Sequence, residues 1–361
     1  MKKLLAALLA GFLALGLAAC GGGSTTAATA AAGAEKPAET TAAAEEKKVD
    51  YPTKAITMII PYGAGGTTDL TGRQLAIALE KQLGQSIIVE NMGGASGSVG
   101  AQAALDADAD GYTVLMTAES LGTQRVMGIS EMSYADFAPI SPIANDPKVM
   151  VVAKDSKYNT IQELLDDIKA NPGKIQMSYT GPGGSGHVQS LILNKFGYEP
   201  ALTAYTGGAD CITAVLGGQV AFTNSNYATV ASYLKSGDLK CLAICSTNPL
   251  PVYPEVPTLA SVIEGSDELL SIPYTPLSLL VEKDVPAEIQ EILIDATKKA
   301  VKDPDFEKYM TDNCIDKLYE QYPSVEEAKK FYADWESTVS WLLFDAGVTV
   351  ESPETFNIPK P

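Results

Sequence analysis

Short apolar runs alternate with segments of helical periodicity through most of the chain after residue 49. Residues Ile56–Ile60 form a continuous apolar run of strand length. Residues 68–83 then repeat apolar side chains at helical spacing, with Leu75, Ala78 and Leu79 on one face, and stop at Gly84. Short apolar strands that alternate with helices predict an α/β fold with largely parallel sheets.

The same reading places the remaining elements along the chain. Further strands are expected at residues 87–90, 112–117, 140–144, 149–153, 175–179, 202–204, 219–223 and 239–245. Further helices are expected to end near residue 105 and to span residues 161–170, 186–196, 209–216, 227–235, 287–301, 305–312 and 324–343. Beyond residue 245 the pattern therefore predicts only helices.

Three glycine-rich loops each lie at the start of a predicted helix, in residues 61–69, 181–187 and 205–210. Such a loop leaves backbone N–H groups free, and the positive end of the following helix adds to them. Ligands of parallel α/β sheets bind beyond the carboxyl ends of strands, where these loops fall. Two or three facing loops are therefore predicted to hold a small acid without a charged side chain.

The N-terminus has the pattern of an export signal. Lys2 and Lys3 precede an apolar run, and small residues precede Cys20. The segment 17–20 is similar to a bacterial lipobox, so we interpret residues 1–20 as a lipoprotein signal peptide with Cys20 as the lipidated residue. The alternative is an ordinary signal peptide with a chance cysteine. Residues 21–48 lack large apolar side chains and are predicted to be a disordered tether that holds the folded part clear of a membrane.

Length and charge limit the remaining possibilities. Residues 49–361 are long enough for two domains. Two of the glycine loops must face the first across a cleft, which predicts one domain of residues 49–153 plus 274–361 and a second of residues 154–273. The net charge of -18, from 26 Lys+Arg against 44 Asp+Glu, argues against nucleic acid as a partner.

The cysteines and the single histidine give no sign of a metal site. Cys241 and Cys245 are too far apart along one predicted strand to bond each other. The pairs Cys211–Cys241 and Cys245–Cys314 both remain open as disulfides. Because His187 is the only histidine and no Cys/His cluster exists, neither a metal nor a cofactor is expected.

Several titratable residues near the loops have competing interpretations. Asp69 is expected to organise the first loop, and Arg73 to pair with it on the same helix face. Arg125 is the other arginine of the chain and the one candidate for clamping a carboxylate. Glu119 follows a predicted strand. If it faces the cleft, it favours a ligand that carries an ammonium group.

Two enzymatic patterns are weak. The spacing Gly181-x-Gly183-x-x-Gly186, with Glu199 further on, matches a dinucleotide fingerprint, but an exported protein does not normally meet NAD. His187 could act as a base beside Ser185, Ser120 or Asp69, but no nucleophile elbow is present. His187 is therefore expected to orient its loop or to bind a ligand.

With these motifs in hand, the chain resembles the substrate-binding proteins of tripartite tricarboxylate transporters, the TctC/Bug family. The resemblance covers roughly residues 51–343 and rests on the segments 51–73, 89–100, 110–113, 171–174, 181–187, 205–207, 216–220 and 255–258. The chain departs from the family pattern at residues 203–207, and Tyr274 is the nearest match to a tryptophan that the family often carries.

The resemblance implies a two-domain periplasmic-binding-protein-like fold of the Venus flytrap, type II-like kind, without enzymatic activity or cofactor. It implies a monomer that closes on a small organic acid, a di- or tricarboxylate or related carboxylate, with the first and second loops as opposing pincers. The acid would pass to integral membrane subunits similar to TctA and TctB. A ligand-presenting partner of a sensor kinase is the alternative, and an extracellular enzyme acting on an organic acid is a weaker one.

The candidate ligand-binding residues come from the three loops and from neighbouring strand ends. They are Tyr62, Gly65, Gly66, Thr67, Asp69, Glu119, Ser120, Thr180, Gly183, Gly184, Ser185, His187, Tyr205, Gly208, Asp210, Asn224 and Tyr274.

Overall fold

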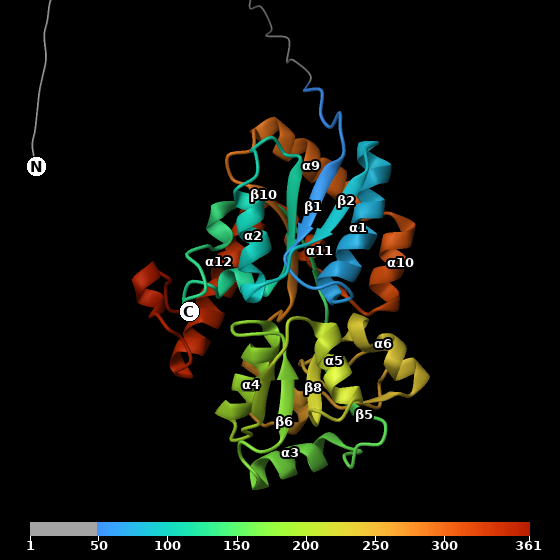
Figure 1. Cartoon of the computed structure of the whole chain (residues 1–361), viewed down its shortest axis with the longest axis vertical. Helices are drawn as coiled ribbons and strands as arrows, with labels where there is room; N and C mark the ends of the chain where they lie inside the picture. The colour runs from blue at the N-terminus through green and yellow to red at the C-terminus, as the bar shows by residue number, and fades with distance from the viewer. Residues whose placement is uncertain (1–48) are drawn as a thin grey trace, which may run out of the picture. The chain divides into compact units, whose positions relative to one another are not determined.

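The computed structural model describes residues 49–361, which contain two β-sheets with helices packed around each (Figure 1). We call the part around each sheet a lobe, the first lobe carrying the sheet that includes the N-terminal strand. The expected signal peptide, Cys20 and the tether lie outside the described residues. In residues 49–361, no helix has the length and apolar character needed to cross a membrane.

The sheet of the first lobe has the strand order β11-β4-β10-β3-β1-β2. Its strands are β1 (Ile56–Ile60), β2 (Ile87–Asn91), β3 (Thr113–Thr117), β4 (Phe137–Asn145), β10 (Pro276–Glu282) and β11 (Asp316–Lys317). The helices of these chain segments are α1 (Thr67–Leu83), α2 (Ser98–Leu105), α9 (Ala287–Ala300), α10 (Pro304–Asp312), α11 (Leu318–Gln321) and α12 (Val325–Asp345). Single 3-10 turns are η1 (Ala95–Gly97), η2 (Glu119–Gly122), η3 (Tyr134–Asp136) and η4 (Pro353–Phe356).

The sheet of the second lobe has the order β7-β6-β8-β5-β9. Its strands are β5 (Lys148–Ala153), β6 (Gln176–Tyr179), β7 (Ala201–Ala204), β8 (Phe222–Asn226) and β9 (Leu239–Ile244). The helices between β5 and β10 are α3 (Ile161–Ala170), α4 (Ser185–Lys195), α5 (Gly208–Leu216), α6 (Tyr227–Ser236), α7 (Leu259–Val262) and α8 (Asp267–Leu270).

The expected α/β architecture is confirmed, but the sheets are mixed rather than largely parallel. β2, β1 and β3 run parallel, and so do β7, β6 and β8. β10 is antiparallel to both β3 and β4, and β5 is antiparallel to both β8 and β9. The chain passes from the first lobe to the second between β4 and β5 and returns just before β10. Because no helix lies between β4 and β5, β5 enters the second sheet without the helical crossover that a parallel strand needs.

Several strands differ from the sequence prediction: β11 was not predicted, β4 begins three residues earlier than expected, and β10 and β8 differ for identifiable reasons. β10 lies inside the first sheet and was not predicted, because its run Leu277–Leu280 is buried on both faces and shows no period. β8 begins three residues later than expected. The N–H groups of Gln219 and Val220 both bond to the carbonyl of Ala214, so these residues complete the end of α5 instead of starting a strand.

The expected domain boundary after residue 153 also differs from the sheet pairing. β5 pairs with β8 and β9, so this strand belongs to the second lobe and the chain leaves the first lobe at Asp146-Pro147. It returns just before β10. α12 contacts both β4 and α4, and one apolar cluster includes Trp335 of α12 and Leu191 of α4. The C-terminal helix therefore packs against elements of both lobes.

Local sequence signals set the helix ends that we predicted. Thr160 accepts a hydrogen bond from the N–H of Glu163 and so caps α3. α1 ends at Gly84, whose φ of 67° is the left-handed conformation that glycine adopts without strain. Cys211, Cys241, Cys245 and Cys314 are free thiols, so neither of the two open disulfide pairings is present.

The position of β10 gives a stability prediction. Leu279 is 0% exposed between β3 and β4, so we expect Leu279→Ala to lower the free energy of unfolding by about 2–5 kcal/mol. Ile88→Ala, at a residue that is 49% exposed, is the control and should change it by less than about 0.5 kcal/mol. Urea denaturation measures both variants. Equal effects would contradict the central placement of β10.

Candidate functional site

A cavity of about 250 Å³ lies where loops of the two lobes meet. It is lined by residues that follow strands and precede helices, as expected for ligand sites of α/β folds. The lining residues that the sequence predicted are Tyr62, Gly66, Thr67, Asp69, Glu119, Thr180, Ser185, Tyr205 and Gly208. No arginine or lysine is among the lining residues that the structure describes.

The first loop presents the start of α1 to this cavity. The N-cap residue Gly66 has no side chain that could cap the helix. The first-turn N–H groups of this 17-residue helix are therefore open to an outside acceptor. Gly66, Thr67 and Thr68 all line the cavity. The helix start is therefore the best-placed anion site in the cavity.

Asp69 holds the first loop in shape, as expected. Its carboxylate accepts hydrogen bonds from the Gly65 N–H (2.9 Å), from Arg73 Nε (2.9 Å) and from Asn91 Nδ2 (3.0 Å). Burial opposes its ionisation, but these bonds outweigh burial and keep the pKa of Asp69 below its usual value. The Gly65 N–H is consequently not free for a ligand.

The third loop lies opposite the first. A Cβ atom added to Gly65 would come within 4.0 Å of the Ala209 Cβ, and one added to Gly207 within 4.0 Å of the Gly63 Cα. Gly207 is the N-cap of α5 and also lacks a side-chain cap. The open ends of α1 and α5 thus face each other, whereas the resemblance had implied that the first and second loops form the pincers.

The second loop is hydrogen-bonded to residues of the first lobe. Thr123 Oγ1 donates to the carbonyl of Gly183 at 3.0 Å, and Ser96 Oγ donates to the carbonyl of Pro182 at 3.0 Å. The Ser185 N–H, at the start of α4, donates to Glu119 Oε1 at 2.6 Å. A carboxylate of the protein itself therefore sits where a ligand carboxylate was expected.

In this loop Gly183 has less room for a side chain than its neighbour Gly184. Gly183 has a φ of 75°, and an added Cβ would lie 2.5 Å from Thr123 Oγ1 in the other lobe. Gly184 has an extended backbone, and an added Cβ would meet only ordinary contacts at 3.4 Å and beyond. A substitution in this loop is therefore strained at Gly183 and not at Gly184.

Other predicted residues do not line the cavity and bond within the protein. His187 Nδ1 accepts the Gly183 N–H at 3.1 Å, and burial lowers the pKa of this histidine, so its visible role is to orient the loop. Asn224 donates to the Gly186 carbonyl, and the Tyr274 hydroxyl donates to the carbonyl of Leu269. Asp210 accepts from Thr206 Oγ1 at 2.5 Å.

Ser120 and Tyr62 form one hydrogen bond at the edge of the site, with their oxygens 2.6 Å apart. Tyr62 lines the cavity but Ser120 does not. Burial, with the nearby charge of Glu119, raises the pKa of Tyr62 to about 12, so this hydroxyl stays neutral.

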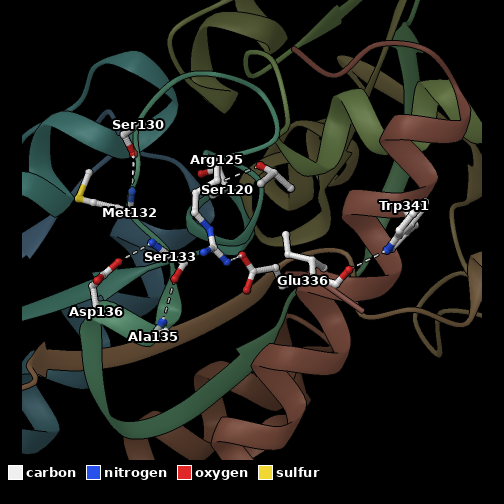
Figure 2. Close-up of polar contacts among 11 residues, drawn as sticks. Ser120, Arg125, Ser130, Met132, Ser133, Ala135, Asp136, Glu336 and Trp341 are labelled. Atoms are coloured by element: carbon white, nitrogen blue, oxygen red, sulfur yellow. Dashed lines mark hydrogen bonds and ion pairs between the residues drawn. The ribbon is translucent and has the colours of Figure 1, made fainter. Parts of the chain in front are cut away.

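Arg125 does not clamp a ligand. Figure 2 shows its side chain reaching Glu336 on α12, and its Nη2 lies 2.6 Å from Glu336 Oε1. Arg125 is absent from the cavity lining, as is Arg73. The donors that the cavity lining offers to an anion are therefore backbone N–H groups and hydroxyls.

The sequence analysis missed the polar cluster where the chain crosses between the lobes. Asp146 accepts a hydrogen bond from Thr67 Oγ1, and its backbone carbonyl accepts one from Asn226 Nδ2 at 3.0 Å. Asn226 also donates to Thr275 Oγ1 at 2.9 Å, and Asn226, Thr229 and Thr275 line the cavity. The turn signal Asn-Asp-Pro at residues 145–147 marks the crossing, but nothing local connects it with the first loop.

The sequence analysis also did not predict that residues 94–97 line the cavity. Ala95 and Ser96 have positive φ angles, and the segment Gly94, Ala95, Ser96 and Gly97 lines the cavity. Within residues 49–361, no group of three or more His, Cys, Asp or Glu residues is placed to hold a metal ion.

Comparisons with known proteins show what this chain is similar to. Residues 71–341 match the model of the Tripartite tricarboxylate transporter family receptor, TctC. Protein BugT of Bordetella pertussis is 31% identical over 229 residues, which span 62% of this chain and 70% of BugT. The structure of periplasmic binding protein BugD has a TM-score of 0.74 and 26% identity, covering 83% of this chain and 99% of BugD. A second solved structure, of a periplasmic transporter, has a TM-score of 0.71 and 28% identity over 79% of this chain and 96% of that one. The expected periplasmic-binding-protein fold is confirmed.

Asp146 makes the stability of the protein depend on pH. Burial raises the pKa of Asp146 to about 7, although Thr67, Ala228 and the charge of Lys148 favour its ionised form. The folded state therefore binds this proton more tightly than the unfolded state, and stability falls as pH rises toward 7. Between pH 5 and pH 8 we expect wild type to lose on the order of 3 kcal/mol relative to Asp146→Asn.

Urea denaturation of both proteins at the two pH values measures this difference. Asp155→Asn, at an exposed aspartate, is the matched control and should follow wild type. An unchanged gap between wild type and Asp146→Asn at pH 5 and pH 8 would show that Asp146 does not titrate as the structure requires.

Proposed function

Since the chain belongs to the tripartite tricarboxylate transporter receptor family, a family of periplasmic solute-binding proteins, we propose that it captures a small organic acid between its lobes. We further propose that it delivers this acid to a membrane transporter of the tripartite tricarboxylate type and catalyses no reaction itself. The single observation that carries the proposal is the open start of α1 in a cavity without cationic side chains.

Backbone groups supply the positive potential that this acid needs. The N-terminal ends of α1 and α5, which are the positive ends of the helix dipoles, face the same space. Each N–H donor at these ends contributes on the order of 1 kcal/mol to the binding of an anion. The hydroxyl of Thr229 is placed to orient the rest of the molecule, and the Thr67 oxygen, whose proton bonds to Asp146, can accept a further hydrogen bond. The high negative charge of the chain is screened and lies mostly on its surface.

Closure of the lobes gives the mechanism of capture. Hydrogen bonds from Ser96 and Thr123 join the first lobe to the second loop, and the contact of Thr67 with Asp146 joins α1 to the crossing segment. A ligand that binds α1 and α5 together adds to these contacts and stabilises the closed form. Release at the transporter then requires the same contacts to open.

The alternatives have less support. A catalytic role would need His187 as a base, but its Nδ1 is occupied by the Gly183 N–H and the residue is absent from the cavity lining. A ligand-presenting partner of a sensor kinase would use the same cavity and differs only in the protein that it meets. Co-purification with membrane transporter subunits, rather than with a kinase, would support the transport role.

Identification of the ligand tests the proposal directly. We expect native mass spectrometry of the purified protein to detect a bound molecule with at least one carboxylate, and calorimetry to confirm binding of that molecule. A neutral or cationic ligand without a carboxylate would overturn the proposed function.

The closure contacts give a second test. Gly183→Ala places a Cβ against Thr123 of the first lobe at a residue with positive φ, so we expect it to weaken binding of the identified acid by at least about tenfold, or 1.4 kcal/mol. Gly184→Ala, one residue further, meets only ordinary contacts and should bind within about twofold of wild type. Equal affinities in calorimetry would contradict a closure that depends on this loop.

We also propose that a lipid on Cys20 anchors the protein to the extracytoplasmic face of the membrane and that residues 21–48 act as its tether, with the folded part a monomer. The proposal rests on the residues around Cys20 in the sequence. Cys20→Ser should leave the protein soluble or unprocessed. Membrane fractionation and the mass of the mature N-terminus measure this, and a cleaved variant that remains in the membrane would exclude the anchor.

A further inference from the structure

Glu119 brings a buried carboxylate to the cavity from the first lobe. It begins η2, directly after β3, and only 6% of it is exposed. It lines the cavity together with the starts of α1 and α5. Because a buried carboxylate is costly without partners, its contacts decide which groups can bind beside it.

The contacts of Glu119 are few. Oε1 accepts the Ser185 N–H at 2.6 Å, while Oε2 is buried and has no hydrogen-bond partner among residues 49–361. The buried ammonium of Lys148 contacts the Asn224 carbonyl at 3.5 Å and Asn226 Oδ1 at 3.3 Å instead. The carboxylate is therefore held by one donor, and half of its acceptor capacity is unused.

The residue that donates a hydrogen bond to Glu119 lies at the start of a helix. Ser185 is the first residue of α4, an 11-residue helix whose N-cap Gly184 provides no side-chain acceptor. The N-terminal end of α4 is an anion site for the same reason as the N-terminal ends of α1 and α5. In this structure the protein supplies that anion, so the second glycine loop has no place for a ligand carboxylate.

We propose that Glu119 determines specificity by filling this second carboxylate subsite, so that the cavity selects an acid that also carries an ammonium group, such as an amino acid. The proposal rests on the proposed function, because the ligand carboxylate is assigned to α1 and α5. A second ligand carboxylate would meet Glu119 with a like charge in a cavity that no cationic side chain lines, since Lys148, whose charge interacts with Glu119, is not among the lining residues. An ammonium group beside Glu119 would instead gain a favourable charge interaction with this carboxylate.

Pairs of ligands that differ only by an ammonium group test this inference. The probes are the common amino acids and their amine-free counterparts, including L-aspartate with succinate and L-glutamate with glutarate. Calorimetry with the full chain at neutral pH should show at least a tenfold preference for the amino acid in the best-binding pair. Tighter binding of the amine-free member in that pair would overturn the inference.

Substitution of Glu119 shows whether this residue causes the preference. Glu119→Gln keeps the size and an oxygen acceptor for the Ser185 N–H, so we expect the fold to persist. This variant should bind the amino acid at least tenfold more weakly than wild type, and its affinity for the amine-free acid should be unchanged or higher. Glu90→Gln removes the same charge at an exposed residue of β2 that does not line the cavity, and it should behave as wild type.

The possible outcomes separate the inference from the function on which it rests. An unchanged preference in Glu119→Gln, or a co-purified ligand with carboxylates and no amine, rejects the role of Glu119 but keeps acid binding. Binding of neither member of any pair, or a ligand without a carboxylate, rejects the proposed function itself. If Glu119 only joined the lobes, Glu119→Gln would lower the affinity for both members of a pair equally, which also rejects selection.

Discussion

The N–H groups in the first turn of each helix need an acceptor, and the way this requirement is met organises the cavity. α4 receives its acceptor from Glu119 of the opposite lobe, and the loop before α1 receives one from Asp69. The first turns of α1 and α5 receive none from a cap side chain. The cavity therefore forms around the two helix starts that the protein leaves open.

The crossing segments make this arrangement possible. β4 leads through Asp146 into β5, and the chain returns into β10 in the middle of the first sheet. Asp146 bonds Thr67 at the start of α1, so the crossing is attached to the first loop. A change in the relative position of the lobes must alter contacts at both places, which couples the shape of the cavity to the backbone between the lobes.

Local parts of this structure could be predicted from the sequence, because short-range rules determine them. The strand Ile56–Ile60, the α1 end at Gly84, the Thr160 cap and the Asp69–Arg73 pair depend on neighbours within a few residues. Strand direction, the insertion of β10 and the facing of the first and third loops depend on contacts between distant segments. No period or spacing in the sequence records those contacts, and for that reason Gly65, Gly184 and Ser185 were expected to serve a ligand although their N–H groups bond within the protein.

The three glycine loops have similar local chemistry, yet they do different work because different residues face them. The second loop meets Glu119, while the first and third lie close to each other beside the cavity. Glu119 belongs to none of the three loops. A single side chain outside the second loop thus supplies the anion at the start of the helix that follows this loop. Under the proposed function, the sign of charge that a ligand needs at each position would follow from the residue opposite each helix start, and glycine content alone would not determine it.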